Sequence, residues 1–125
     1  MNVSRNFLLA GSAFLIVGLM IGMYMGGSGD HALAASHAHI NLLGFVLSVL
    51  FALTYKAYPA MTEGRLAGYH FWLHLAGAFI VNALLFLLLA GVISEAAMVP
   101  LAPISELLIL VGVILYGWNV IQNAN

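Results

Sequence analysis

Long apolar runs alternate with short polar breaks along this chain. Four runs are about as long as the roughly 20 residues that a helix needs to cross the hydrocarbon core of a bilayer. They cover residues 7–26, 38–55, 66–93 and 101–121, and glycine, proline or polar residues separate them. The pattern predicts an all-α integral membrane protein, built as a single four-helix transmembrane domain over residues 1–125.

Composition narrows the class of protein further. Hydrophobic residues make up 64% of the chain and charged residues only 6%, which excludes a water-soluble globule. With three Lys or Arg and a net charge of −1, the chain lacks the basic surface that nucleic acid requires. It has no Cys, so thiolate metal sites, disulfides and iron–sulfur clusters are excluded as well. Five His among so few polar residues are therefore the main chemical clue.

The basic residues predict the orientation. Arg5 precedes the first apolar run, and Lys56 and Arg65 lie between the second and third runs. The positive-inside rule assigns these positions to the cytoplasm. We therefore expect both termini in the cytoplasm, in the inner membrane of a prokaryote, with the loop around Asp30 on the outer side.

Two His in the second apolar run point in different directions. At 100° per residue, His37 shares a face with Asn41, Gly44, Ser48 and Tyr55, whereas His39 lies about 200° away from His37. One metal ion does not easily accept both rings from a regular helix. Such a helix can instead place one ligand on each of two flat cofactors, or the two rings can be a helix cap and an interfacial polar residue.

The same residues resemble a known motif. Asp30-x6-His37-Ala38-His39, followed by residues 41–45 and 55–59, resembles the tenth helix of the haem–copper oxidase catalytic subunit, with C-type cytochrome oxidases and nitric oxide reductases most similar. Arg65 and the run His70-Phe71-Trp72-Leu73 resemble the start of the following helix in that family. The resemblance covers about residues 30–80.

The resemblance implies a fold, a cofactor and residue roles. The chain would resemble one four-helix arc of the oxidase subunit and bind haem b. His37 would take the role of the high-spin haem ligand, His39 that of the low-spin ligand, and Asp30 the acidic position near the haem propionates, with Asn41 on the cofactor-binding stripe. The implied function is electron transfer or a haem-dependent redox or sensing step, with a redox partner.

The departures from the family pattern are as informative. The chain has only four apolar runs and no second His motif for copper, so one chain cannot be an oxygen reductase of the usual kind, and whether it is an enzyme stays open. A second axial ligand for a haem on His39 would have to come from another copy. We therefore expect a homo-oligomer in the bilayer, a trimer or a dimer.

Small residues also predict close helix packing. Gly18, Gly22 and Gly26 form two successive GxxxG steps, and Gly44, Ser48 and Ala52 repeat small residues at the same spacing. Either stripe can be a seam within the chain or an interface between copies.

The residues alone leave two other hypotheses for the function. In one, His31, His37, His39 and Asp30 gather Cu or Zn near the outer surface. In the other, the chain is a structural or assembly subunit without a cofactor. Glu106 would begin the fourth helix as a first-turn acid, or would be a partner for His37 or a proton-accepting group.

His70 and His74 share a helix face. Counting from the inner end of the third apolar run puts them at the cytoplasmic side, about 30 Å from the outer cluster. There they would be interfacial rings, or a pair that clips a metal or frames a haem edge.

Overall fold

The computed structural model describes all 125 residues and is all-helical. Four stretches, Val3–Ser28, Ala34–Ala57, Leu66–Leu89 and Leu101–Asn123, are helices long and apolar enough to cross a membrane, as the hydropathy pattern predicts. The elements are α1 (Val3–Ser28), α2 (Ala34–His39), the π-helix η1 (Ile40–Val46), α3 (Leu47–Ala57), the 3-10 helix η2 (Pro59–Thr62), α4 (Leu66–Leu89), the 3-10 helix η3 (Glu95–Met98) and α5 (Leu101–Asn123).

Local chemistry sets the helix ends. The Asn2 side chain accepts a hydrogen bond from the Arg5 N–H and caps α1, and Gly29 ends the same helix at a φ of 72°. Helix α4 ends at Leu89, four residues before the expected Ile93, and Gly91 follows at a φ of 75°. A left-handed φ favours glycine, so the chain turns there although apolar residues continue beyond it.

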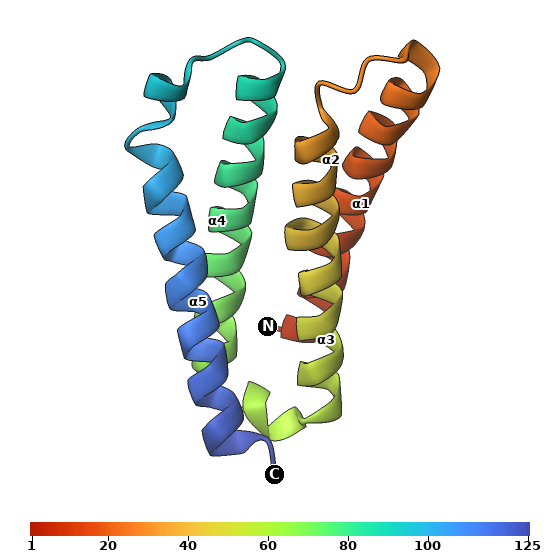
Figure 1. Cartoon of the computed structure of the whole chain (residues 1–125). Helices are drawn as coiled ribbons and strands as arrows, with labels where there is room; N and C mark the ends of the chain where they lie inside the picture. The colour runs from red at the N-terminus through yellow and green to blue at the C-terminus, as the bar shows by residue number, and fades with distance from the viewer.

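The four long helices form two hairpins that lie side by side (Figure 1). In the first hairpin, α1 packs along α2, η1 and α3; in the second, α4 packs along α5. Fewer contacts join the hairpins to each other, through α4 and the 3-10 helix η2. Both chain ends lie in the half of the molecule where α3 leads into α4 (Figure 1).

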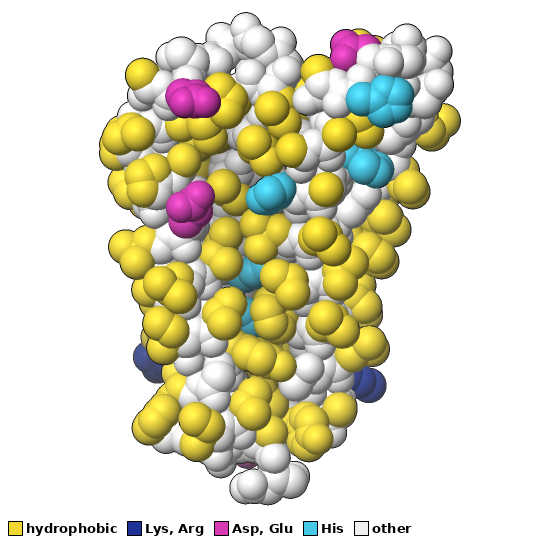
Figure 2. Space-filling model, viewed as in Figure 1, with side chains coloured by type: hydrophobic (Ala, Val, Ile, Leu, Met, Phe, Trp, Pro, Cys, Tyr) yellow, Lys and Arg dark blue, Asp and Glu magenta, His cyan; other side chains and the backbone are white.

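Apolar side chains cover the outer surface. Figure 2 shows hydrophobic residues over the length of one face, with the Lys and Arg side chains toward the lower end and most of the visible acidic side chains in the upper half. Large exposed residues such as Leu19, Leu50, Phe79 and Ile114 would be unfavourable in water and suit contact with lipid. The chain is thus built as an integral membrane protein.

Glycines of both stripes of small residues face larger side chains of the opposite helix inside the first hairpin. A Cβ added to Gly18 or Gly22 would meet a polar side chain of η1 or α2, and one added to Gly44 would meet a ring of α1. The pairs are Gly18 with Asn41, Gly22 with His37 and Gly44 with Phe14. These glycines form a seam within the chain, so a role between copies is wrong for them. Gly26 lies outside the seam, with open space around it.

A large apolar core joins the hairpins in the half of the molecule that holds the chain ends. It includes Phe7 of α1, Phe51 and Tyr55 of α3, and Phe71 of α4. Above it, α1 and α4 leave an apolar groove of about 1150 Å³ between them, lined among others by Phe14, Ile21, Phe79 and Phe86. Asp30 and Tyr24 also line it.

The second hairpin depends on one close approach of helices. A Cβ on Gly77 of α4 would lie 2.7 Å from the Ser105 carbonyl oxygen and 2.6 Å from Cγ1 of Ile109, both on α5. A backbone carbonyl cannot move aside as the end of a side chain can. Only glycine therefore fits at this crossing.

We expect Gly77→Ala to lower the free energy of unfolding by about 1–3 kcal/mol, because the added methyl overpacks the crossing of α4 and α5. Gly117→Ala on α5 is the matched control, since nothing lies within 4 Å of its Cβ position. The control should be neutral or stabilising by up to about 1 kcal/mol through helix propensity. Thermal unfolding in detergent measures both, and equal melting temperatures for the two variants would contradict the tight crossing.

Candidate functional site

The second membrane span contains a break in its backbone hydrogen bonding. In η1 the Leu47 N–H donates to the Leu42 carbonyl, five residues back, and the ordinary α pattern resumes in α3. At the change from π bonding, in which each N–H donates five residues back, to α bonding, in which it donates four residues back, one backbone carbonyl receives no N–H. That carbonyl belongs to Leu43. Such π segments are frequent at functional sites.

His74 supplies the missing donor. Its Nε2 lies 3.1 Å from the Leu43 carbonyl oxygen, across the interface between the hairpins. A carbonyl only accepts, so the proton is on Nε2 and the neutral ring keeps a bare lone pair on Nδ1. That Nδ1 is buried and has no hydrogen-bond partner. The side chain is 1% exposed.

His70, one turn earlier on α4, repeats this arrangement. Its Nδ1 lies 2.9 Å from the Tyr55 hydroxyl, while its Nε2 is buried without a partner. The side chain is fully buried. The hydroxyl can donate or accept, so His70 can hold its proton on either nitrogen. Each imidazole is thus fixed by one nitrogen and leaves the other free.

Aromatic rings from three other helices enclose this pair. Phe7 of α1 lies 5.1 Å from the His70 ring and 5.8 Å from the His74 ring, centroid to centroid. Phe51 of α3 lies 4.4 Å and 5.3 Å from the same two rings. Tyr116 of α5 adds a ring 5.2 Å from His70. We call Phe7, Phe51, Tyr55, His70, His74 and Tyr116 the aromatic cage.

The cage overturns the expected depth of His70 and His74. Interfacial rings would be exposed, and a separation of about 30 Å from the outer cluster would keep them away from the part of the second span near His39. His74 instead bonds to Leu43, which is only four residues, or about 6 Å of helix, from His39. The counting was wrong because it placed His39 at the outer membrane edge, whereas the helix begins at Ala34 and His39 lies more than one turn inside it.

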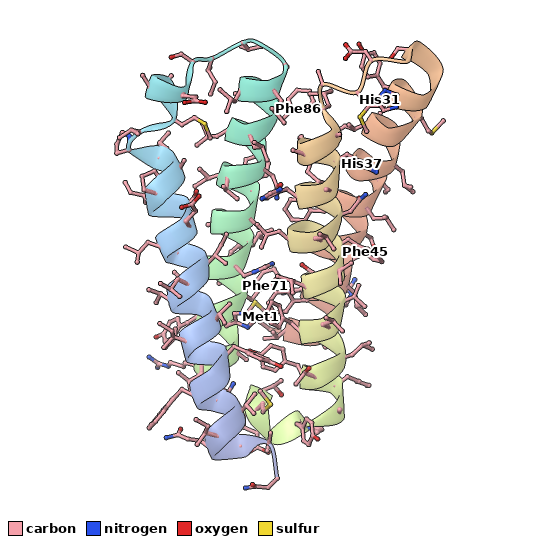
Figure 3. All side chains as sticks on the ribbon, in the orientation of Figure 1. Met1, His31, His37, Phe45, Phe71 and Phe86 are labelled. Carbon is pink, nitrogen blue, oxygen red and sulfur yellow. The ribbon has the colours of Figure 1, made fainter.

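His37 faces α1, as the helical counting predicts. Its Nδ1 lies 2.7 Å from the Gly18 carbonyl oxygen, so Nδ1 donates and Nε2 is the acceptor. The Asn41 amide nitrogen lies 3.4 Å from Nε2. Gly22 makes room for the ring. Figure 3 shows His37 on α2, on the side of α1, with His31 on the turn above it.

His39 leaves the helix in a different direction and is exposed on the outer surface of the chain. Its Nδ1 lies 3.2 Å from the Ala35 carbonyl oxygen of its own helix. The proton is therefore on Nδ1, and Nε2 carries a lone pair for which the structure has no hydrogen-bond partner. Leu42 and Val46 are exposed beside it on the same span.

The outer His and acidic residues do not assemble into a metal site. No group of three or more His, Asp or Glu that could hold a metal ion is present, so the Cu or Zn cluster of His31, His37, His39 and Asp30 has no support from the arrangement of these side chains. Local bonds hold two of its members: His31 Nδ1 to the Gly29 carbonyl at 3.0 Å, and Asp30 Oδ1 to the Ala32 N–H. These residues turn the chain between α1 and α2.

Glu106 is neither the first-turn acid nor the hydrogen-bond partner of His37 that the sequence suggests. Helix α5 begins at Leu101, so Glu106 lies in its second turn and the first turn has no acid. The hydrogen bonds of His37 go to Gly18 and Asn41, so Glu106 is not its partner. Its side chain is exposed.

Sequence reasoning missed the residues that position the two buried imidazoles. Tyr55 was placed on the face of His37, yet its hydroxyl bonds to His70. The i, i+4 spacing of His70 and His74 was a signal for a shared face, but nothing in the sequence marks the Leu43 carbonyl as free.

Comparisons with protein-family models, with curated proteins and with solved structures found no match to this chain.

Proposed function

We propose that this chain is a haem b-binding membrane protein of the haem–copper oxidase lineage, with one four-helix arc of the oxidase subunit as its fold, and that His39 is an axial ligand. Its role would be electron transfer or a haem-dependent redox or sensing step. The observation that carries the proposal is the state of His39, an outward-facing imidazole with its proton held on Nδ1 and its Nε2 lone pair free.

This arrangement fits what an axial ligand needs. Metal-ligating His residues almost always donate their other ring N–H to a carbonyl or carboxylate, which fixes the tautomer and the ring direction. The Ala35 carbonyl does this for His39. Leu42 and Val46 beside it are apolar, as the edge of a porphyrin requires. Bound there, haem would supply one-electron chemistry or a binding place for a diatomic gas.

His37 fits the ligand role less well. The Gly18 carbonyl and the Asn41 amide engage both of its ring nitrogens, and a Cβ on Gly22 would lie 2.9 Å from its Cε1. A haem plane on this side would require α1 to separate from α2. In our proposal His37 and Asn41 therefore hold α1 against the helix that carries His39.

Replacing His39 with Ala should remove the b-type absorption of the purified protein, because Ala offers no lone pair to the iron. The measurement is the reduced-minus-oxidised spectrum with haem content per chain. His31→Ala is the matched control, since His31 is also exposed and also bonded through Nδ1 to a nearby carbonyl. Both variants should keep wild-type helicity. An unchanged spectrum in His39→Ala, or no haem in the wild type, would overturn the proposal in favour of a structural or assembly subunit.

The second axial ligand comes from a neighbouring copy in this proposal. Among the other His residues, His37 faces α1, His74 is buried and His31 lies on the turn before α2. Mass measurement in detergent should give a dimer or a trimer. The three-arc plan of the oxidase subunit favours the trimer. A monomer that retains six-coordinate haem would rule out ligation between copies.

The proposal also includes an orientation in a prokaryotic inner membrane with both termini in the cytoplasm. Arg5, Lys56 and Arg65 support it, because all three belong to the half of the molecule that holds both chain ends (Figures 1 and 2). A reporter that is active only in the periplasm should be active in the Gly27 loop and silent after Asn125. The reverse pattern would invert the orientation.

A further inference from the structure

The aromatic cage holds two buried imidazole nitrogens for which the haem proposal has no use. His70 Nε2 and His74 Nδ1 each lie inside the protein without a hydrogen-bond partner. Burying such an atom unpaired costs free energy, and buried polar atoms normally find a partner. Of the six buried side-chain atoms without a partner, these two are the imidazole nitrogens, and they lie on adjacent turns of one helix, where one ligand held between the rings would satisfy both.

We infer that His70 and His74 bind a single monovalent copper ion, Cu(I), inside the cage. Both rings already have the support that metal-ligating imidazoles need, since the Tyr55 hydroxyl engages Nδ1 of His70 and the Leu43 carbonyl accepts from Nε2 of His74. His74 Nδ1 carries a lone pair in the neutral ring, and His70 Nε2 carries one when Nδ1 donates to Tyr55.

The spacing of the two rings suits a shared ion. Two imidazoles that bind one metal through nitrogens about 2.0 Å from it have ring centres between about 5 and 6.5 Å apart, and the longer distance corresponds to a linear arrangement. The His70 and His74 centroids are 6.1 Å apart. This distance matches the linear end of the range, which Cu(I) adopts with two nitrogen ligands, and a linear site requires the two free nitrogens to face each other across the ion.

Charge selects Cu(I) over a divalent metal. Asp30, Glu63, Glu95 and Glu106, the four acidic residues of the chain, are all exposed, so no carboxylate neutralises an ion in the cage. The cost of moving an ion out of water grows with the square of its charge, which penalises Zn²⁺ far more than Cu(I). Structural Zn²⁺ also takes four ligands, and only two are present. The Phe7 and Phe51 rings nearby suit a single positive charge.

The test uses Cu(I) alone, supplied without oxygen to the purified full chain in detergent, in competition with a colorimetric chelator. We expect one ion per chain and an X-ray absorption signature of two nitrogen ligands without sulfur. An excess of Zn²⁺ should leave the copper in place. Absence of binding, a sulfur ligand, three or more ligands, or displacement by Zn²⁺ would each overturn the inference, and none of these measurements needs a variant.

Two variants remove the free nitrogens and keep the supporting hydrogen bonds. In His70→Asn the amide occupies the place of Nδ1 and can still bond to Tyr55, and in His74→Gln the amide occupies the place of Nε2 and can still donate to Leu43. Each should weaken Cu(I) binding by more than the roughly 10- to 100-fold that loss of an outer partner costs a metal site. Wild-type affinity in either variant would place the ion elsewhere.

His39→Gln separates this inference from the haem proposal. It removes the proposed axial ligand and leaves the cage intact, so it should bind Cu(I) like the wild type while losing haem. Copper binding that disappears in His39→Gln but survives in His74→Gln would move the copper to the outer surface and refute the cage site. A protein that never contains haem can still pass or fail the copper test.

Discussion

A membrane interior contains no water to bond to an exposed backbone group, and this constraint explains the centre of the molecule. The π segment leaves the Leu43 carbonyl without a donor from its own helix. His74 bonds to it from the other hairpin. The irregular hydrogen bonding of one helix thus provides the acceptor for a polar contact between the two hairpins. The rings of the aromatic cage surround His74, which donates to that acceptor.

The His residues differ in which main-chain carbonyl holds the protonated ring nitrogen. One ring nitrogen of His37 and one of His74 bond to main-chain carbonyls of neighbouring helices, so both rings join helices together, and His74 keeps its second nitrogen free. His39 spends its nitrogen on its own helix and keeps its other face outward. The same imidazole chemistry is therefore used in two ways within one span, and the difference lies only in which carbonyl is within reach.

Much of the architecture follows from the sequence. Four apolar runs of sufficient length predict four helices, because a bilayer of fixed thickness demands about 20 residues for each crossing. The opposite directions of His37 and His39 follow from 100° per residue, since both lie before the π segment has shifted the helix phase. The end of α4 does not follow, because Gly91 stops the helix while the residues around it remain apolar.

The buried pair shows where such counting fails. The face of Tyr55 was predicted on a regular helix, and η1 lies between Tyr55 and the residues used as reference. A hydropathy pattern does not reveal a π segment, in which the backbone hydrogen bonds change from four to five residues. The cage also draws Phe7, Phe51, His70 and Tyr116 from four different helices, so no local pattern contains it.

The groove between α1 and α4 exposes the packing of these two helices to the surrounding lipid or detergent. Its walls are almost entirely apolar, so water does not fill it, and an empty space of about 1150 Å³ would forfeit dispersion contacts along both helices. Hydrocarbon chains suit such walls, so lipid in a bilayer, or detergent tails of a different length in a micelle, would fill it. The distance between α1 and α4 would then depend on the thickness and chain packing of the surrounding medium as well as on the amino acids.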